Sequence, residues 1–335
     1  MSTRALLILS TSLCLSAVGA ACSAPEPAGA PIVIDGSSTV HPIADTLATE
    51  YRKKHSTQTI TLTSSSTGVG LKRFCAGELD VANASRNITD AESAACAQAG
   101  VTFIELPIAY DAISIVVNPA NSWATSITVP ELKKLWEPAA EGKIKRWSQV
   151  RAGWPDKEIH LVGPDAESGT FDYFNQSITG APKSSRKDYA ANVDDNKIIS
   201  AVEADELALG YLGFTYFEKE HGKVKALALD DLNEQIAPGP VELTVKNVRR
   251  GVYLPLSRPL FVYVKSQSIE RHEVQQFMEF YLRFSADMVD RIGGIRLAQR
   301  ESELAIDRLM RRVPGTMFSA SDEGDISLEM RLSKK

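Results

Sequence analysis

The sequence predicts an α/β fold in which mainly parallel sheets are flanked by helices. Short β-rich runs alternate with helical patterns along most of the chain, and this alternation is typical of parallel sheets. Several of these runs end in small hydroxyl and glycine residues, after which a helical pattern begins. The chain has 335 residues, of which 44% are hydrophobic, so its length and composition favour a globular protein of roughly two domains.

Three hydroxyl-rich junctions each join a predicted strand to a predicted helix. They occupy residues 32–39, residues 60–68, and residues 159–164 leading to Ser168, Gly169 and Thr170. The start of a helix has unpaired backbone N–H groups and a partial positive charge, so it attracts anions. Ligands of parallel sheets bind beyond the carboxyl ends of the strands, where all three junctions lie. One such junction is ordinary helix capping, but three of them favour a shared pocket for a small oxyanion.

The remaining elements follow from hydrophobic spacing and from helix start signals. A first-turn proline, Pro42, and apolar residues spaced four apart predict a helix over residues 42–54. The predicted strands span residues 32–34, 60–63, 80–84, 101–106, 112–117, 159–162, 208–213, 224–229 and 262–264. The other predicted helices span residues 71–75, 91–99, 129–136, 171–178, 197–204, 273–284 and 302–313. Residues 315–335 are polar and predict a loose tail.

The first 21 residues predict an export signal. Arg4 precedes a short apolar stretch, and small residues follow it up to Cys22. A spanning helix needs about 20 apolar residues, which this stretch and all later ones lack, so we expect an exported protein in the periplasm or at the cell surface. Residues 22–30 are a flexible tether by composition. Cys22 resembles the lipidated cysteine of a bacterial lipoprotein, and simple cleavage and release is the alternative because Gly19 replaces the usual leucine.

The interior cysteines are Cys75 and Cys96, about 20 residues apart. In an oxidising compartment such a pair predicts a disulfide, and two buried free thiols are the alternative. Closing a loop of this size stabilises a protein by about 3 kcal/mol in the chain-entropy model. The five histidines are scattered, so the sequence predicts no metal site.

The charge distribution gives no indication of nucleic acid as a partner, and an acidic protein can still bind an anion because local dipoles and hydrogen bonds determine the properties of a pocket. The formal net charge is −5 and no long basic run occurs. A buried oxyanion needs a donor for nearly every oxygen and at least one cation, because charge-assisted hydrogen bonds are strong. Arg86 follows a predicted strand and is the expected cation, with a structural ion pair as the alternative. Ser168 has no evident histidine partner and no Gly-x-Ser-x-Gly elbow occurs, so a hydrolase is disfavoured.

Six short segments, taken in order, carry a resemblance to a known family. They are DGSSTV at residues 35–40, FCAGE at 74–78, ASR at 84–86, SGTFDYF at 168–174, ALGY at 208–211 and PLSRPLF at 255–261. This set resembles the PstS-type phosphate-binding proteins, extracytoplasmic receptors of bacterial phosphate ABC transporters. The resemblance implies the periplasmic-binding-protein type II fold, with two lobes, a two-stranded hinge and phosphate held in the cleft between the lobes. It implies a receptor without enzymatic activity or cofactor, whose partners are inorganic phosphate and the permease subunits.

The resemblance also implies a set of phosphate ligands. Carried over by motif, these are Ser38, Thr39, Ser65, Thr67, Ser168, Gly169 and Thr170, with Arg86 as the cation. The choice among Ser64, Ser65, Ser66 and Thr67 stays open, because the family usually has more glycine there.

One ligand of the best-studied branch of this family is missing. That branch has an Asp where this chain has Arg86, and an Arg where this chain has Pro164. A carboxylate accepts the proton of HPO₄²⁻ and repels sulfate, so another acceptor is needed here. Asp172 is the candidate, and Glu167, Asp195 or backbone carbonyls are the alternatives.

The expected organisation places residues 31–110 and 251–314 in lobe 1 and residues 111–250 in lobe 2, with lobe crossings near residues 110–117 and 251–264. We expect a monomer that closes around the anion by a hinge motion. The rival functions are a receptor for sulfate, molybdate or a phosphonate, a receptor that senses phosphate, and a phosphate-ester hydrolase.

Overall fold

The computed structural model describes residues 29–220, 222–318 and 327–333. The predicted signal peptide, Cys22 and the first part of the tether lie outside these ranges. The strands are β1 (Ile32–Gly36), β2 (Ile60–Leu62), β3 (Val81–Ala84), β4 (Phe103–Val117), β5 (Ser126–Thr128), β6 (His160–Pro164), β7 (Ala190–Asn192), β8 (Ala208–Gly213), β9 (Lys225–Ala226), β10 (Ala228–Asp230), β11 (Ser257–Lys265) and β12 (Ile295–Arg296). The α-helices are α1 (His41–Lys54), α2 (Thr67–Cys75), α3 (Asp90–Gln98), α4 (Val129–Trp136), α5 (Trp147–Val150), α6 (Gly169–Ile178), α7 (Asp195–Glu203), α8 (Phe214–Lys219), α9 (Val245–Arg249), α10 (His272–Arg291), α11 (Gln299–Met310) and α12 (Leu328–Ser333).

The main sheet runs through the whole molecule in the strand order β2-β1-β3-β11-β4-β8-β6-β7. At one end β1 pairs in parallel with β2 and β3, and at the other end β6 pairs in parallel with β7 and β8. The two middle strands, β11 and β4, are antiparallel to each other and to their outer neighbours. Each end of the sheet is therefore a parallel unit, and β4 and β11 join the two units.

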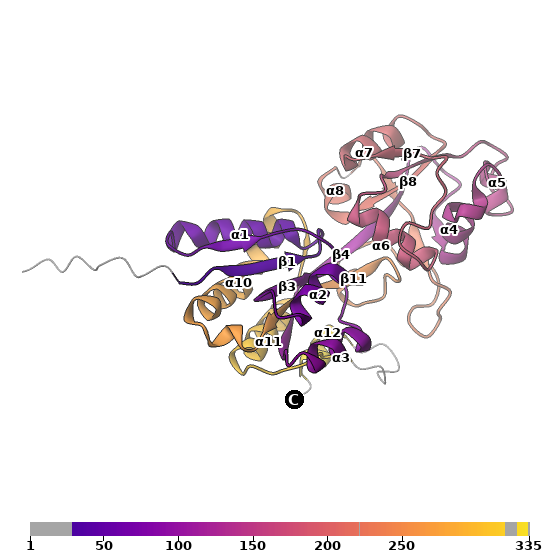
Figure 1. Ribbon diagram of the computed structural model, residues 1–335. Helices are drawn as coiled ribbons and strands as arrows, with labels where there is room; N and C mark the ends of the chain where they lie inside the picture. Colours follow the sequence, from indigo (N-terminus) through magenta and orange to yellow (C-terminus); the bar gives the residue numbers. More distant parts are fainter. Residues whose placement is uncertain (1–28, 221, 319–326, 334–335) are drawn as a thin grey trace, which may run out of the picture.

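The molecule has two lobes, which lie on either side of these joining strands (Figure 1). One lobe contains β1–β3 with α1, α2, α3, α10 and α11, and the other contains β6–β8 with α4 to α8. β4 crosses between them: it pairs with β11 up to Ala112 and with β8 from Ile113 onwards. The segment before β11 makes the second crossing, where the N–H of Ile113 donates to the carbonyl of Leu256 at 2.9 Å. The predicted two-lobed α/β fold is confirmed.

Each lobe is stabilised by its own cluster of buried apolar side chains. Trp136 packs edge-on against Phe174 and Tyr211 in the second lobe. In the first lobe Tyr51 packs against Phe277 between α1 and α10. Burying a large side chain of this kind stabilises the fold by about 1.5–3 kcal/mol.

Local signals fix several helix starts as the sequence predicts. The side chain of Thr128 accepts a hydrogen bond from the N–H of Glu131 and opens α4 with a complete capping box. Pro42 lies in the first turn of α1, where its missing N–H costs nothing. Among the described residues, no helix is both long enough and apolar enough to cross a membrane.

Two predictions about the elements are wrong. The apolar runs at residues 101–106 and 112–117 belong to a single strand, β4, because the strand continues through both lobes. The loose tail predicted at residues 315–335 is folded in its described part. The N–H of Gly315 donates to the carbonyl of Phe103 at 2.7 Å, and α12 packs against α11. Leu328 and Leu332 are four residues apart, so both lie on the buried face of α12 while its polar residues face outwards.

Candidate functional site

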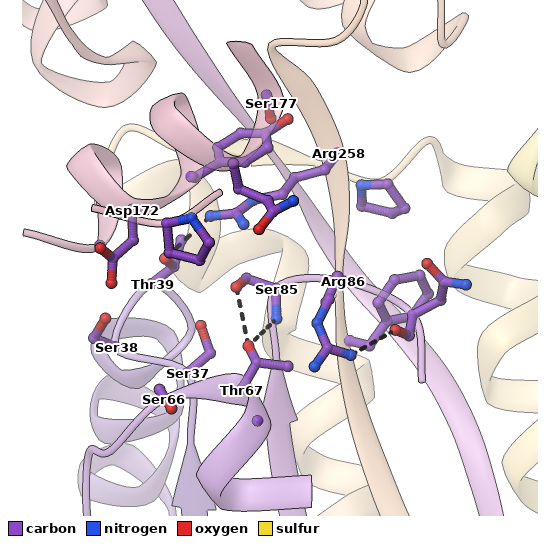
Figure 2. A pocket seen from close by; sticks show the side chains of 18 of the residues that line it. Ser37, Ser38, Thr39, Ser66, Thr67, Ser85, Arg86, Asp172, Ser177 and Arg258 are labelled. Atoms are coloured by element: carbon purple, nitrogen blue, oxygen red, sulfur yellow. Dashed lines mark hydrogen bonds between the residues drawn. The ribbon is translucent and has the colours of Figure 1, made fainter. Parts of the chain in front are cut away.

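A cavity of about 650 Å³ lies between the lobes, beyond the carboxyl ends of β1, β3 and β6. Figure 2 shows side chains from both lobes pointing towards it. Its polar walls are made by Ser37, Ser38, Thr39, Ser66, Thr67, Ser85, Arg86, Asn87, Asp172, Gln176, Ser177, Ser257 and Arg258. The rest of the wall is Gly68, Gly169, Tyr173, Pro182, Pro255, Pro259, Phe261 and Phe318. The predicted junctions therefore share one cavity, as their positions on the parallel sheets require.

The first junction joins β1 to α1 and brings Ser37, Ser38 and Thr39 to the cavity. Gly36 precedes them with a φ of 134°, and a side chain there would collide with the carbonyl oxygen of Asn83. Glycine is thus required for the close approach of β1 to β3 at this corner. Within the described part of the chain, the backbone N–H groups of Ser38 and Thr39 have no hydrogen-bond partner.

The second junction joins β2 to α2 and differs in detail from the sequence prediction. Ser66 caps the helix, accepting a hydrogen bond from the N–H of Val69 at 3.3 Å, and it lines the cavity. The Thr67 hydroxyl lies 3.1 Å from that of Ser85 and accepts a hydrogen bond from the Ser85 N–H at 3.0 Å. Ser65 does not line the cavity, because its N–H pairs with the carbonyl of Gly36 at 2.9 Å and continues the sheet.

The third junction joins β6 to α6 in the other lobe. Ser168 caps α6 and accepts a hydrogen bond from the N–H of Thr170 at 3.2 Å. Gly169 lines the cavity, whereas Ser168 and Thr170 are partly buried at its edge. A Cβ atom on Gly169 would lie 2.9 Å from the Ser38 hydroxyl and 3.4 Å from that of Thr39. The first turn of α6 therefore faces the first junction directly across the cleft.

Asp172 lies in the first turn of α6 and points into the cavity (Figure 2). Its Oδ1 atom is buried and has no hydrogen-bond partner within the described residues. Burial raises the pKa of this carboxyl, Lys183 opposes the shift and Glu167 adds to it. The two alternative acceptors lie elsewhere: the Glu167 side chain is 86% exposed, and Asp195 accepts the N–H of Gly213 at 3.3 Å outside the cavity wall.

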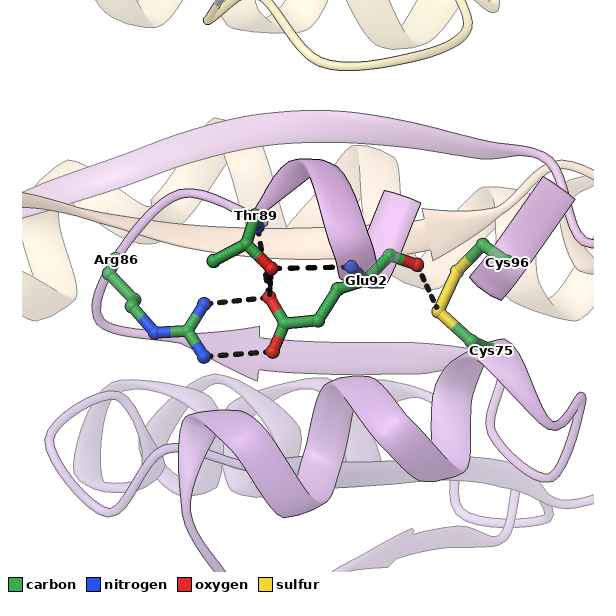
Figure 3. Close-up of a disulfide and its surroundings, with 5 residues drawn as sticks. All are labelled: Cys75, Arg86, Thr89, Glu92 and Cys96. Atoms are coloured by element: carbon green, nitrogen blue, oxygen red, sulfur yellow. Dashed lines mark hydrogen bonds and ion pairs between the residues drawn. A yellow bond between two sulfur atoms is a disulfide. The ribbon is translucent and has the colours of Figure 1, made fainter. Parts of the chain in front are cut away.

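Arg86 lines the cavity, but a carboxylate already holds its guanidinium. Nη1 and Nη2 each donate to Glu92 at 2.8 Å, and this bidentate pair raises the pKa of Arg86 (Figure 3). The Glu92 side chain also completes the capping box of Thr89 at the start of α3. The sequence reasoning missed Glu92, although it lies six residues after Arg86, near the start of the predicted helix.

The predicted disulfide between Cys75 and Cys96 is confirmed. It links the end of α2 to α3, and the Sγ atom of Cys75 lies 3.4 Å from the carbonyl oxygen of Glu92 (Figure 3). The helix that begins with Ser66 and Thr67 is thereby tied to the helix that holds Arg86 in place.

A second cation in the wall, Arg258, was also missed. It lies near the start of β11, and its Nη2 lies 3.1 Å from Asp111 on β4. The segment at residues 255–261 carried part of the family resemblance, and this was the only sequence signal for Arg258. Pairing of β4 with β11 brings Asp111 and Arg258 into register, and the sequence alone does not give that register.

Comparisons with known proteins agree with this fold. A model of the PBP superfamily domain matches residues 21–284. Protein SphX of Synechococcus elongatus is 39% identical over 288 residues, which cover 86% of this chain and 84% of the relative. Phosphate-binding protein PstS of Staphylococcus epidermidis is 33% identical over 278 residues, covering 82% of this chain and 81% of the relative.

A solved structure extends the similarity to three dimensions. The crystal structure of a possible phosphate binding protein from Planctomyces limnophilus is 40% identical, with a TM-score of 0.79, and the match covers 86% of this chain and all of the other. The chain therefore belongs to the PBP superfamily, in the family that includes the PstS phosphate-binding proteins.

Proposed function

We propose that this protein captures inorganic phosphate between its two lobes and delivers it to the permease of an ABC transporter. The observation that carries the proposal is the convergence of helix starts from both lobes on one cavity that also contains two arginines. Relatives and a solved neighbour named as phosphate-binding proteins support the choice of anion. An anion held between two lobes draws them together, which is how receptors with a hinge close.

The donors for the anion come from several sources. Four backbone N–H groups at the helix starts have no hydrogen-bond partner within the described residues: those of Ser38, Thr39, Gly68 and Gly169. Hydroxyl donors are supplied by Ser38, Thr39, Ser66 and Thr67, and in the closed state by Ser168 and Thr170. Ser65, predicted by motif, would join them only if the backbone of the second junction shifts, and Ser66 takes its place in the cavity wall. Arg86 supplies positive charge beside the second junction.

Asp172 is the proposed acceptor for the proton of the bound phosphate. Its Oδ1 is buried without a partner, and a buried acceptor gains most from a donor that the ligand brings. Sulfate has no proton to donate at neutral pH, so the same carboxylate repels it. This arrangement favours phosphate over sulfate or molybdate.

The proposed cellular role includes export, retention at the membrane through a lipid on Cys22 with cleavage and release as the alternative, and action as a monomer without enzymatic activity. A serine nucleophile activated by histidine is not supported for phosphate-ester hydrolysis, because the cavity wall formed by the described residues contains no histidine. Binding without turnover is the chemistry that this wall of donors supports.

Titration calorimetry of the mature chain with phosphate, sulfate and molybdate tests the proposal. We expect tight binding of phosphate and binding of sulfate that is at least about 100-fold weaker, a difference of about 2.7 kcal/mol. Tight binding of sulfate or molybdate without phosphate binding would overturn the choice of anion. Turnover of a chromogenic phosphate ester that Ser168→Ala abolishes would overturn the role as a receptor.

A further inference from the structure

Arg258 lies in a different part of the cavity from Arg86 and contacts both lobes. It lies where the joining strands meet, and its side chain is 16% exposed. Nε and Nη2 approach the same oxygen of Asp111, at 3.2 and 3.1 Å, and Nη2 lies 3.4 Å from the hydroxyl of Thr39. The guanidinium also stacks on the ring of Tyr173, with 3.5 Å from Cζ to the ring centroid. Arg258 thus contacts the hinge, the first lobe and the second lobe at once, and Figure 2 shows it beside Thr39.

The two arginines differ in how much of their hydrogen-bonding capacity is already used. Arg86 gives both terminal nitrogens to Glu92 at 2.8 Å, and its side chain is 41% exposed. In Arg258, Nε and Nη2 share a single carboxylate oxygen of Asp111, at longer distances than those between Arg86 and Glu92. Within the described residues, Nη1 of Arg258 has no hydrogen-bond partner. A guanidinium with a free terminal nitrogen in a partly desolvated cavity forms a strong charge-assisted bond with an anion.

We propose that Arg258 is a second cationic ligand of the bound anion and that it couples binding to closure of the lobes; this rests on the proposed capture of phosphate. Nη1 donates to a phosphate oxygen, while Nη2 stays with Thr39 and Asp111. The anion, Thr39 and Tyr173 then all meet at one guanidinium. An anion that orders Arg258 therefore also fixes α6, which carries Tyr173, against the start of α1.

The stacking on Tyr173 is central to the coupling. The hydroxyl of Tyr173 donates to the carbonyl of Pro255 at 2.9 Å, so the ring is held against the segment that crosses between the lobes. The guanidinium of Arg258 lies over the face of this ring and makes a cation–π contact with it. A lysine at the same position keeps a charge but loses the planar fork and most of the stacking.

The test is phosphate calorimetry together with small-angle X-ray scattering on the mature chain, for the parent and four variants. We expect Arg258→Gln to weaken phosphate binding at least about 30-fold, which corresponds to about 2 kcal/mol. We expect Arg258→Lys to recover part of this affinity but to show a smaller decrease in radius of gyration on adding saturating phosphate. Arg151→Gln is the matched control, because Arg151 also pairs with a carboxylate, that of Glu131, and stacks on Trp154, but lies outside the cavity wall.

The double variant Arg258→Gln/Asp111→Asn separates direct binding from simple neutralisation of Asp111. If Arg258 contacts the anion, the double variant stays at least about tenfold weaker than the parent. Recovery of parental affinity in the double variant would overturn the proposal, because Arg258 would then act only by neutralising the negative charge of Asp111. Parental affinity in Arg258→Gln would overturn it as well. A parent protein that binds no phosphate would instead refute the proposed function, so the two failures are distinguishable.

Discussion

At the scale of single residues, Arg86 tests whether the second junction binds the anion. We expect Arg86→Ala to weaken phosphate binding by at least 2 kcal/mol, because Glu92 is then left as an unpaired negative charge beside the anion. Calorimetry measures the change. Arg271→Ala is the control. Arg271 also pairs with carboxylates, but it contacts Ala30 just before β1, at the end of that strand that points away from the cavity. Equal dissociation constants for parent and Arg86→Ala would remove Arg86 from the site.

Asp172 determines the expected discrimination between phosphate and sulfate. In Asp172→Asn the side chain can donate a hydrogen bond, so it no longer repels an anion without a proton. We expect phosphate binding to fall by about 1.5–3 kcal/mol, the range for a hydrogen bond to a charged group, and sulfate binding to strengthen. Paired titrations at pH 8 measure both. Glu167→Gln is the control, because Glu167 lies just before α6 with a side chain that is 86% exposed, and an Asp172→Asn variant with parental selectivity would contradict the assignment.

The sequence could predict the junctions but only part of the site's charge network. Hydroxyl and glycine residues after a strand carry their own local signal, so Ser38, Thr67 and Gly169 were found from the sequence. Arg258 reaches the cavity only because β11 pairs with β4, and that long-range register has no local signature. Ser65 and Ser66 are adjacent and chemically alike, and only the backbone direction at the end of β2 decides which one faces the cleft.

At the scale of elements, the contact between the starts of α1 and α6 limits how far the lobes can close. A methyl group at position 169 would lie 2.9 Å from the Ser38 hydroxyl, which is closer than such atoms approach. We expect Gly169→Ala to weaken phosphate binding about tenfold or more, while the melting temperature of the ligand-free protein changes little. Calorimetry and thermal unfolding measure the two effects. Gly180→Ala would be strained by its φ of 92°, so Ser200→Ala in α7, an exposed position outside the cavity wall, is the better control. Undiminished affinity in Gly169→Ala would show that closure does not bring these helix starts together.

The elements themselves were predictable where their signals are local. The capping threonine of α4 and the first-turn proline of α1 mark helix starts directly. By contrast, α12 has only six residues and lies in a polar segment, so its burial depends on the surface that α11 offers. The continuity of β4 was hidden because Pro107 and Asp111 interrupt the apolar pattern between the two predicted runs, whereas pairing with β11 and then β8 keeps the strand extended through both lobes.

At the scale of the whole molecule, buried carboxyl groups make stability depend on pH. Burial raises the pKa of Asp195 from 3.8 to about 6, and burial also raises the pKa of Glu105, which lies in the first lobe. The folded state thus favours the protonated form of both groups. Their stabilising contribution is fully present below the unfolded pKa of about 4 and is lost as the pH rises through the folded value. The hydrogen bond from Arg186 lowers the pKa of Asp188 to about 2, so its contribution is lost only as the pH falls from about 4 towards 2.

We therefore expect the free energy of unfolding of the ligand-free protein to be highest near pH 4–5 and to fall as the pH rises towards 7. The shift of Asp195 accounts for at most about 3 kcal/mol of this fall. Asp195→Asn keeps a neutral side chain beside the N–H of Gly213 and should flatten the curve between pH 4 and 7, because no charge then forms in the buried site. Urea unfolding at each pH measures the curves, with the exposed Glu167→Gln as a control that should follow the parent. If Asp195→Asn has the same slope as the parent over this range, the Asp195 carboxyl ionises in the folded protein without cost, and any pH dependence must come from the other carboxyls whose pKa burial raises, Glu105, Asp172 and Glu301.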